Sequence, residues 1–201
     1  MNGITQPLTD RGRQTFNTIC RGAETLFHQK GYHLTTIADI AKKSEVGIGT
    51  FYLYFSDKYA IYKHLLFEYS HQIRANIAIA VAGIQTRKEQ ERVGIKTFIK
   101  YVRDNPQAYT IIWQSLQVDK ELFVDYYQSF ARHYAKGLAE AHQRGEIARS
   151  DYITASYALM GVANFVGLQV IMFEQDMSSD EKIEAIVDHL IEVLESGLFK
   201  K

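Results

Sequence analysis

The hydrophobic pattern repeats with a helical period along most of the chain. Between Asp10 and Lys30 apolar side chains recur every three or four residues, and Gly31 follows as a natural C-terminal stop. Eight further periodic segments lie at about residues 36–43, 48–54, 57–83, 88–103, 106–118, 119–144, 150–173 and 179–197. Because only two prolines occur in 201 residues, the pattern predicts an all-α protein of about nine helices.

Polar residues ahead of several segments predict where the helices begin. Thr36, followed three residues later by Asp39, forms a capping-box pattern. Asn105 and Pro106 are typical of a cap and a first helical residue, because proline lacks an N–H that the first turn would leave unpaired. The other expected caps are Ser56, Asp119, Ser150 and Ser178 or Ser179. The segments predict a head of short helices, residues 1–56, joined by a long helix to a helical body, residues 57–201.

One long segment is uncharged. From Tyr152 to Phe173 no side chain carries a charge, and a helix of that length could cross a bilayer. It contains serine, asparagine and glutamine, and no basic cluster flanks it, so a helix buried in protein is favoured. The single cysteine, Cys20, excludes an intramolecular disulfide, and the N-terminus lacks the apolar core of a signal peptide. We therefore expect a cytoplasmic protein that does not enter the membrane.

Charge is unevenly divided between head and body. Residues 1–65 contain eight Lys or Arg and five Asp or Glu side chains, a net charge of +3. The remaining residues balance this charge, because the chain as a whole is neutral. A basic head on an acidic body suits binding of the head to a polyanion.

The run GIGTFYLYFSDKY, residues 47–59, combines glycines with aromatics. Two short helices joined by a tight turn and supported by a third make a helix-turn-helix, whose second helix enters the DNA major groove. Glycine would let the backbone approach DNA closely, and tyrosine rings can pack below while their hydroxyls reach phosphates. Core packing is the alternative for these aromatics, and Phe51 and Phe55 are assigned to it. The expected DNA contacts are Thr36, Lys43, Gly47, Ile48, Gly49, Thr50, Tyr52, Tyr54 and Lys58.

The sequence around this run resembles the DNA-binding domain of the TetR/AcrR family of transcriptional regulators. The resemblance lies in TTIADIAKKSEVGIGTFYLYFSDKYAIY and the upstream ICRGAETLFHQKGY, and it covers about residues 14–65. It implies a helical body that binds a ligand and pairs two chains. Two departures stand in the turn. Glu45 occupies a position where glycine commonly takes a left-handed conformation, and Gly47 replaces a capping hydroxyl.

The last two helices favour pairing of two chains. Apolar residues of the final helix cover an arc of roughly 140°, and the uncharged helix before it is apolar nearly all round. Two such helices per chain could form a four-helix interface, with an intramolecular core as the alternative. The resemblance implies the same two helices, and a two-fold homodimer suits a palindromic operator. The expected interface residues are Gly161, Leu168, Ile183, Val187, Leu190 and Leu194.

Aromatic residues recur through the middle of the body. Phe123, Tyr127, Phe130 and Tyr134 form one helical stripe, which other aromatics could face. Apolar walls with a few polar groups suit a small-molecule pocket, and ordinary core packing is the alternative for any single residue. The expected pocket residues are Phe98, Tyr101, Trp113, Tyr127, Phe130, Tyr134, Asn164, Phe165 and Gln169.

The sequence shows no catalytic constellation. It has no nucleophile-elbow, P-loop or zinc-protease motif, its seven histidines are scattered, and we expect no cofactor and no metal. The sequence therefore predicts a homodimeric transcriptional regulator that a small apolar or aromatic ligand releases from double-stranded DNA, with a repressor favoured over an activator. The alternative is an architectural DNA-binding adaptor whose body holds a protein partner.

The reading segment lacks the side chains that recognise bases through paired hydrogen bonds. Residues 47–54 contain no Arg, Lys, Asn or Gln. Ile48 can contact thymine methyl groups, with Phe51 or Tyr52 beside it. Sequence recognition is therefore expected to rest on thymine methyls and DNA shape. Arg11 or Arg13, ahead of the first helix, could add minor-groove contacts.

Overall fold

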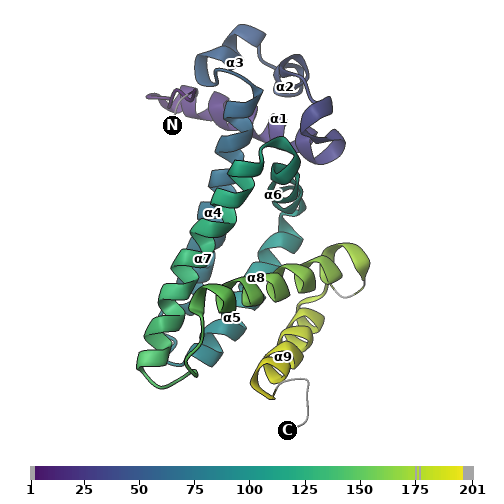
Figure 1. Ribbon diagram of the computed structural model, residues 1–201. Helices are drawn as coiled ribbons and strands as arrows, with labels where there is room; N and C mark the ends of the chain where they lie inside the picture. Colours follow the sequence, from purple (N-terminus) through teal and green to yellow (C-terminus); the bar gives the residue numbers. More distant parts are fainter. Residues whose placement is uncertain (1–2, 175, 177, 197–201) are drawn as a thin grey trace. The chain divides into compact units, whose positions relative to one another are not determined.

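The computed structural model describes residues 3–174, 176 and 178–196, and the regular elements within these residues are all helices (Figure 1). The all-α prediction is confirmed. The helices form two compact units. The first combines the chain up to His71 with Gln107–Tyr126, and the second combines Gln72–Pro106 with the chain from Tyr127 onwards.

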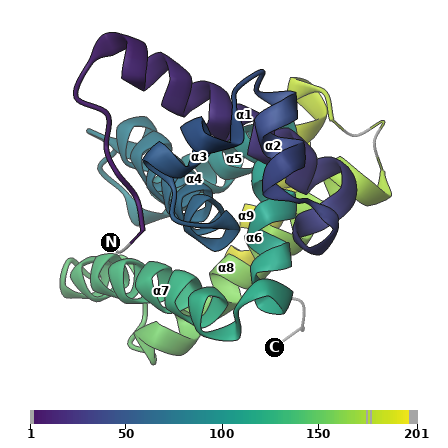
Figure 2. The ribbon, with the colours of Figure 1, turned by 90° about the horizontal axis from the view of Figure 1, so that it is seen from above.

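The first unit contains α1 (Asp10–Leu34), α2 (Ile37–Lys43), α3 (Ile48–Tyr54), the start of α4 (Lys58–Val81) and α6 (Pro106–Val118). Helices α1, α2 and α3 gather around the first turns of α4 (Figures 1 and 2). Their contacts form one apolar core. Its fully buried large side chains include Ile19, Phe27, Ile40, Phe51, Phe55, Ile61, Tyr62 and Leu66.

Helix boundaries in this unit follow the predicted signals. The Thr36 hydroxyl accepts the Asp39 N–H at 3.1 Å while the Asp39 carboxylate accepts the Thr36 N–H at 2.9 Å, so the capping box is present. Gly31, with φ +81°, interrupts α1 as predicted, although one short turn follows it. The cap of α4 differs from the prediction, because Asp57 rather than Ser56 accepts the Ala60 N–H.

A side chain of α6 bridges the break in α1. Gln114 accepts the backbone N–H of Tyr32 at 3.2 Å through Oε1, and its amide nitrogen donates to the Phe27 carbonyl at 3.1 Å. Both backbone groups flank Gly31, where the helical conformation is interrupted. These bonds connect α6 to α1, and α6 lies in the same compact unit as the three head helices.

The second unit is built on α5 (Arg87–Asp104), the later part of α7 (Lys120–Gln143), α8 (Tyr152–Leu168), a π-helical turn η1 (Gln169–Phe173) and α9 (Asp180–Ser196). Asp151 rather than the predicted Ser150 caps α8, because its carboxylate accepts the N–H groups of Ile153 and Thr154. One core cluster joins α5, η1 and α9. It consists of Ile95, Ile99, Val170, Ile183, Val187 and Ile191.

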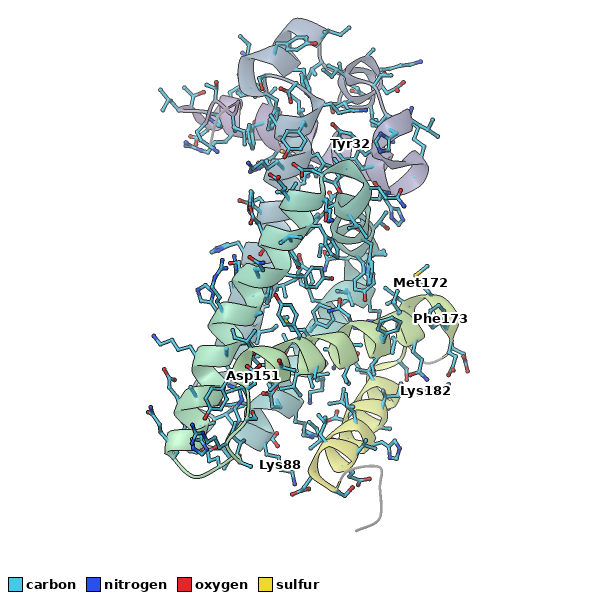
Figure 3. The ribbon with its side chains drawn as sticks, viewed as in Figure 1. Tyr32, Lys88, Asp151, Met172, Phe173 and Lys182 are labelled. Carbon is cyan, nitrogen blue, oxygen red and sulfur yellow. The ribbon has the colours of Figure 1, made fainter. Side chains whose placement is uncertain are left out.

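A basic stripe along α5 pairs with an acidic stripe along α9. The Arg92 guanidinium donates to Asp188 at 2.5 Å and to Glu184 at 3.0 Å. Lys88, labelled in Figure 3, lies at one end of the stripe, with its ammonium 2.7 Å from Glu195. Because the pairing runs antiparallel, the whole length of α9 is held on α5. The paired residues are Lys88, Arg92, Lys96, Lys100 and Arg103 with Asp180, Glu184, Asp188 and Glu195.

Acidification is expected to destabilise the second unit through this stripe. Hydrogen bonds from Lys100 and Arg103 lower the pKa of Asp180 to about 2, and basic partners also lower the pKa values of Glu184 and Asp188. A carboxylate with a lowered folded pKa stabilises the fold above its unfolded pKa, and that contribution is lost as pH falls through the folded pKa. Between about pH 5 and 2 the melting temperature should therefore fall more for wild type than for D180N/E184Q/D188N. Circular dichroism measures this, and an equal fall in both proteins would contradict the assignment.

Helix α8 and η1 leave an apolar face uncovered. The segment Tyr152–Phe173 is long and apolar enough to span a membrane by length and composition, and 22% of its most apolar stretch is buried. Ile153 and Phe165 are 43% and 63% exposed, and Met172 and Phe173 stand exposed at the end of the segment (Figure 3). Among the residues that the structure describes, none therefore covers this face of the helix, which differs from the sequence expectation.

Candidate nucleic-acid interface

Helix α3 presents an apolar and aromatic face to solvent. Its N-cap is Gly47, as predicted, and Phe51 is fully buried and anchors the helix in the head core. The exposed fractions of Ile48, Tyr52 and Leu53 are 50%, 53% and 65%. We call Ile48, Gly49, Tyr52 and Leu53 the reading face. Of the two aromatic residues predicted to lie near the bases, Tyr52 is exposed and Phe51 is buried. Leu53, which the sequence analysis did not name, is exposed beside Tyr52.

The glycines of α3 are not needed for packing inside the protein. A Cβ atom built on Gly49 meets no atom within 4 Å, and one built on Gly47 meets only the Thr50 hydroxyl, at 3.9 Å. By contrast, a Cβ on Gly22 would lie 2.2 Å from the Ser44 hydroxyl, so that glycine is required for α1 to contact the turn. The open surface at Gly49 lets a partner approach the α3 backbone.

The turn between α2 and α3 is strained, as the sequence predicts. Glu45 has φ +54°, and a non-glycine residue in this region costs about 1 kcal/mol. The Glu45 N–H donates to the Lys42 carbonyl at 3.2 Å, and the Val46 N–H donates to the Ala41 carbonyl at 3.0 Å. These bonds hold the turn with Glu45 in the left-handed conformation.

Two predicted contact residues are partly engaged within the head. The Tyr54 ring packs edge-on against Phe16, at 5.8 Å between centroids, and a side chain on Gly12 would lie 3.6 Å from the Tyr54 hydroxyl. The Thr36 hydroxyl serves the capping box, where bonds from Lys30 and Thr36 hold the pKa of Asp39 well below its usual range. Both side chains thus position helices in addition to any contact with a ligand.

Lys58 is engaged inside the first unit. Its ammonium donates to the carbonyls of Tyr32 and Thr35, both at 2.7 Å, and lies 4.2 Å from the centroid of the Tyr32 ring. Burial lowers its pKa. This geometry differs from the predicted phosphate contact, because two of its three donors cap the end of α1. Lys43, in the last turn of α2, is exposed and suits that contact better.

The N-terminal arginines lie on α1 rather than on a free arm. Arg11 and Arg13 fall in the first turns of α1, which Thr9 caps through a 3.1 Å bond from the Gly12 N–H. The Arg13 guanidinium is paired with Asp10. The predicted minor-groove contact would therefore have to come from exposed positions on a helix.

The residues expected to line a pocket fall in both units. Trp113 lies on α6 in the first unit, 36% exposed, with its ring 6.2 Å from that of Tyr109. The others belong to the second unit, where Phe98 packs against the α5–α9 core. The 63% exposure of Phe165 places it on the open face of α8 and not on an enclosed wall. Asn164 donates to the Met160 carbonyl, and Gln169 begins the π-helical turn.

Arginines cover part of the predicted aromatic stripe on α7. The Arg74 guanidinium lies 5.2 Å from the Phe130 ring centroid, and that of Arg87 lies 5.1 Å from the Tyr134 ring centroid. Arg87 also donates to Glu91 at 2.7 Å, and the Tyr134 hydroxyl donates to the same carboxylate. Burial, followed by Glu91, raises the pKa of Tyr134 well above its usual value. Tyr134 is thus part of a polar cluster, which differs from its predicted role as a pocket wall.

The predicted interface residues separate into an inner and an outer set. Ile183 and Val187 are 0% and 1% exposed, because they pack against α5 in their own chain, and this corrects their assignment to a contact between chains. Leu194 is 43% exposed, and Leu190 packs at the edge of the core. A Cβ on Gly161 would meet nothing within 4 Å, so a second helix can approach α8 there. Leu168 ends α8 and is partly buried.

Comparison with known proteins agrees with this arrangement. Residues 19–65 match the family model for bacterial regulatory proteins, tetR family. YttP of Bacillus subtilis, named as an HTH-type transcriptional regulator, is 26% identical over 110 residues, which are 54% of this chain and 53% of YttP. The chain thus spans about half the length of the curated relative it matches.

Solved structures match over nearly the whole chain. FadR from Bacillus subtilis in complex with stearoyl-CoA has a TM-score of 0.79 at 22% identity, covering 92% of this chain and 100% of FadR. A TetR-family transcriptional regulator from Syntrophomonas wolfei also has a TM-score of 0.79, at 21% identity, covering 93% and 97%. The predicted resemblance to the TetR/AcrR family and the predicted fold are confirmed.

Proposed function

We propose that the chain is a transcriptional regulator of the TetR family, because its head matches that family and its fold is that of TetR-family regulators. The observation that carries the proposal is the reading face on α3. Ile48, Tyr52 and Leu53 point outward from a helix that Phe51 anchors, and Gly49 keeps the backbone accessible. An exposed apolar face on the second helix of a helix-turn-helix suits the major groove.

A selection experiment tests DNA binding directly. Wild-type protein is incubated with a pool of random-sequence duplexes, and the retained duplexes are sequenced. We expect two half-sites related by two-fold symmetry and rich in thymine. Failure to enrich any sequence would contradict the proposed function.

The chemistry of the reading face gives a further prediction about specificity. Ile48 and Leu53 offer no hydrogen bonds, so they favour thymine methyl groups over base edges. Replacing contacted thymines by uracil, which removes only this methyl group, should weaken binding of the selected duplex about tenfold, a loss similar to that of a mismatched base pair. The Ile48→Ala protein should be less sensitive to the same replacement. Strong discrimination at a G·C pair, with no loss on uracil substitution, would contradict this account.

The body is proposed to bind a small apolar or aromatic effector that lowers operator affinity, which makes the protein a repressor. Two observations support the class of ligand: the aromatic residues of α5 and of the later part of α7, which belong to the second unit, and the stearoyl-CoA bound by the similar FadR structure. Native mass spectrometry of the purified protein tests for a bound molecule, with stearoyl-CoA as the first compound to add. Release of the selected duplex on addition supports a repressor, and tighter binding would indicate an activator or corepressor mechanism.

The uncovered face of α8 and the outer flank of α9 are proposed to pair two chains. The exposed residues of α8 repeat at helical spacing, and Leu194 of α9 is also exposed. An exposed apolar surface of this kind is typical of an interface. A homodimer would also present two reading faces to the two halves of a palindromic operator.

A further inference from the structure

Residues 3–7, ahead of α1, are folded onto the C-terminal end of α3, which we call the reading helix. Ile4 pairs antiparallel with Phe55 in an isolated bridge. The Thr5 N–H donates to the Tyr54 carbonyl at 2.8 Å, and the Ser56 N–H donates to the Gly3 carbonyl at 2.9 Å. We call residues Gly3–Pro7 the N-terminal strap.

Glycines at both ends of the strap allow its close contacts with the rest of the head. Gly3 has φ +101°, and a Cβ there would lie 2.5 Å from the Ser56 hydroxyl and 3.3 Å from the Ala60 Cβ. At the other end, a Cβ on Gly12 would lie 3.1 Å from the Pro7 Cβ. A side chain at Gly3 would therefore displace the strap. The close approach of the strap to Ser56 requires glycine at this position.

Helix α3 needs support from outside itself. It has seven residues, about half the length at which an isolated helix becomes stable in water. No side chain caps its N-terminus, and Phe51 is its only buried residue. Its last carbonyls lack partners within the helix, and the Thr5 N–H satisfies that of Tyr54. The strap thus supplies at the C-terminal end the hydrogen bond that the short helix cannot make for itself.

We propose that the N-terminal strap is a positioning element for the reading helix, which fixes the end of α3 and its junction with α4. The inference rests on the proposed DNA-binding function. The strap acts without neutralising phosphates, because residues 1–7 contain no Lys or Arg. The bridge between Ile4 and Phe55 also holds the strap on the head. In this position the strap does not extend towards a DNA groove.

A matched pair of variants at Thr5 tests the proposal. Thr5→Pro removes the N–H that donates to Tyr54, whereas Thr5→Ala keeps it. Thr5→Pro should weaken binding of the duplex selected by wild type about tenfold, and Thr5→Ala should stay within about twofold. The dependence of log K on log salt should keep the same slope, because no phosphate contact is lost. Hydrogen exchange of the α3 amides should quicken in Thr5→Pro while that of α1 and α2 is unchanged.

Several results would overturn the inference. Equal affinities of Thr5→Pro and Thr5→Ala would show that the strap does not position α3. A shallower salt slope would show that the strap binds DNA itself. If Thr5→Pro unfolds the head, Gly3→Val, which keeps every N–H, takes its place with the same expected loss, and wild-type affinity in that variant overturns the proposal. If the wild-type protein enriches no duplex in the selection experiment, that result overturns the proposed DNA-binding function, and this inference with it.

Discussion

Replacing Leu190 and Leu194 by glutamate is expected to give folded monomers that bind the selected duplex at least about 10²-fold more weakly than wild type. Leu194 is 43% exposed on α9, and Leu190, one turn earlier, is partly buried at the edge of the core. A charge at Leu194 is solvated in the single chain, and one at the partly buried Leu190 reaches solvent at the edge of the core. Both charges would be buried between two chains, where an unpaired charge is strongly unfavourable. A monomer also loses the gain in affinity from holding two half-sites at once.

Two substitutions on the same helix serve as controls. His189→Glu places a charge where the side chain is 78% exposed, so this variant should remain a dimer with wild-type affinity. Val187→Glu places a charge at a residue that is 1% exposed against α5, so it should unfold the second unit. Sedimentation velocity and circular dichroism separate these outcomes. A soluble double variant that still sediments as a dimer would place the interface elsewhere.

The position of α9 shows what periodicity alone leaves open. Its apolar arc of roughly 140° favours a surface for another chain, with an intramolecular core as the alternative. In the structure Ile183, Val187 and Ile191 fill the chain's own core. Leu190 packs at the edge of that core, and Leu194 is exposed. A face packed against the chain's own core and a face packed against another chain both require apolar residues. The hydrophobic pattern therefore cannot distinguish the two roles. The sequence did contain an orienting signal, because the basic residues of α5 recur at the spacing of the acidic residues of α9.

The head was predictable because its signals are local. The capping box at Thr36, the left-handed Glu45 and the cap at Gly47 each depend on residues within a few positions, and each is present. At Ser56 and Asp57 two capping residues stand side by side, and the fold uses the second. Local sequence offers no reason to choose between them.

Other roles depend on partners far along the chain. Lys58 was expected to bind phosphate because it follows the reading helix and is basic. Its ammonium instead reaches carbonyls 26 and 23 residues earlier, at the end of α1. The contact of Gly3 with Ser56 joins residues still further apart in the sequence, so the strap gave no periodic or compositional signal. Only the three-dimensional structure brings these groups together.

Gly49→Leu is expected to weaken operator binding about 10²-fold or more without destabilising the protein. A Cβ at this position meets no atom of the chain within 4 Å, so the added side chain has room in the free protein. Leucine is also favoured over glycine within a helix by up to about 1 kcal/mol, so the melting temperature should stay equal or rise. In a complex the same side chain would hold the backbone away from the bases, and two half-sites would each lose about 1–3 kcal/mol of contacts.

A size series at position 49 distinguishes obstruction of DNA from damage to the fold. Gly49→Ala should lose less affinity than Gly49→Leu, because its methyl group extends less far towards the groove, while both variants keep the wild-type circular dichroism spectrum. Binding is measured by fluorescence anisotropy with the duplex selected by wild type, at several salt concentrations. The glycines and aromatics of residues 47–59 would then have separate purposes: Phe51 and Phe55 hold the helix in the core, and Gly49 leaves its outer surface open. Wild-type affinity in Gly49→Leu would mean that DNA does not approach this face of α3.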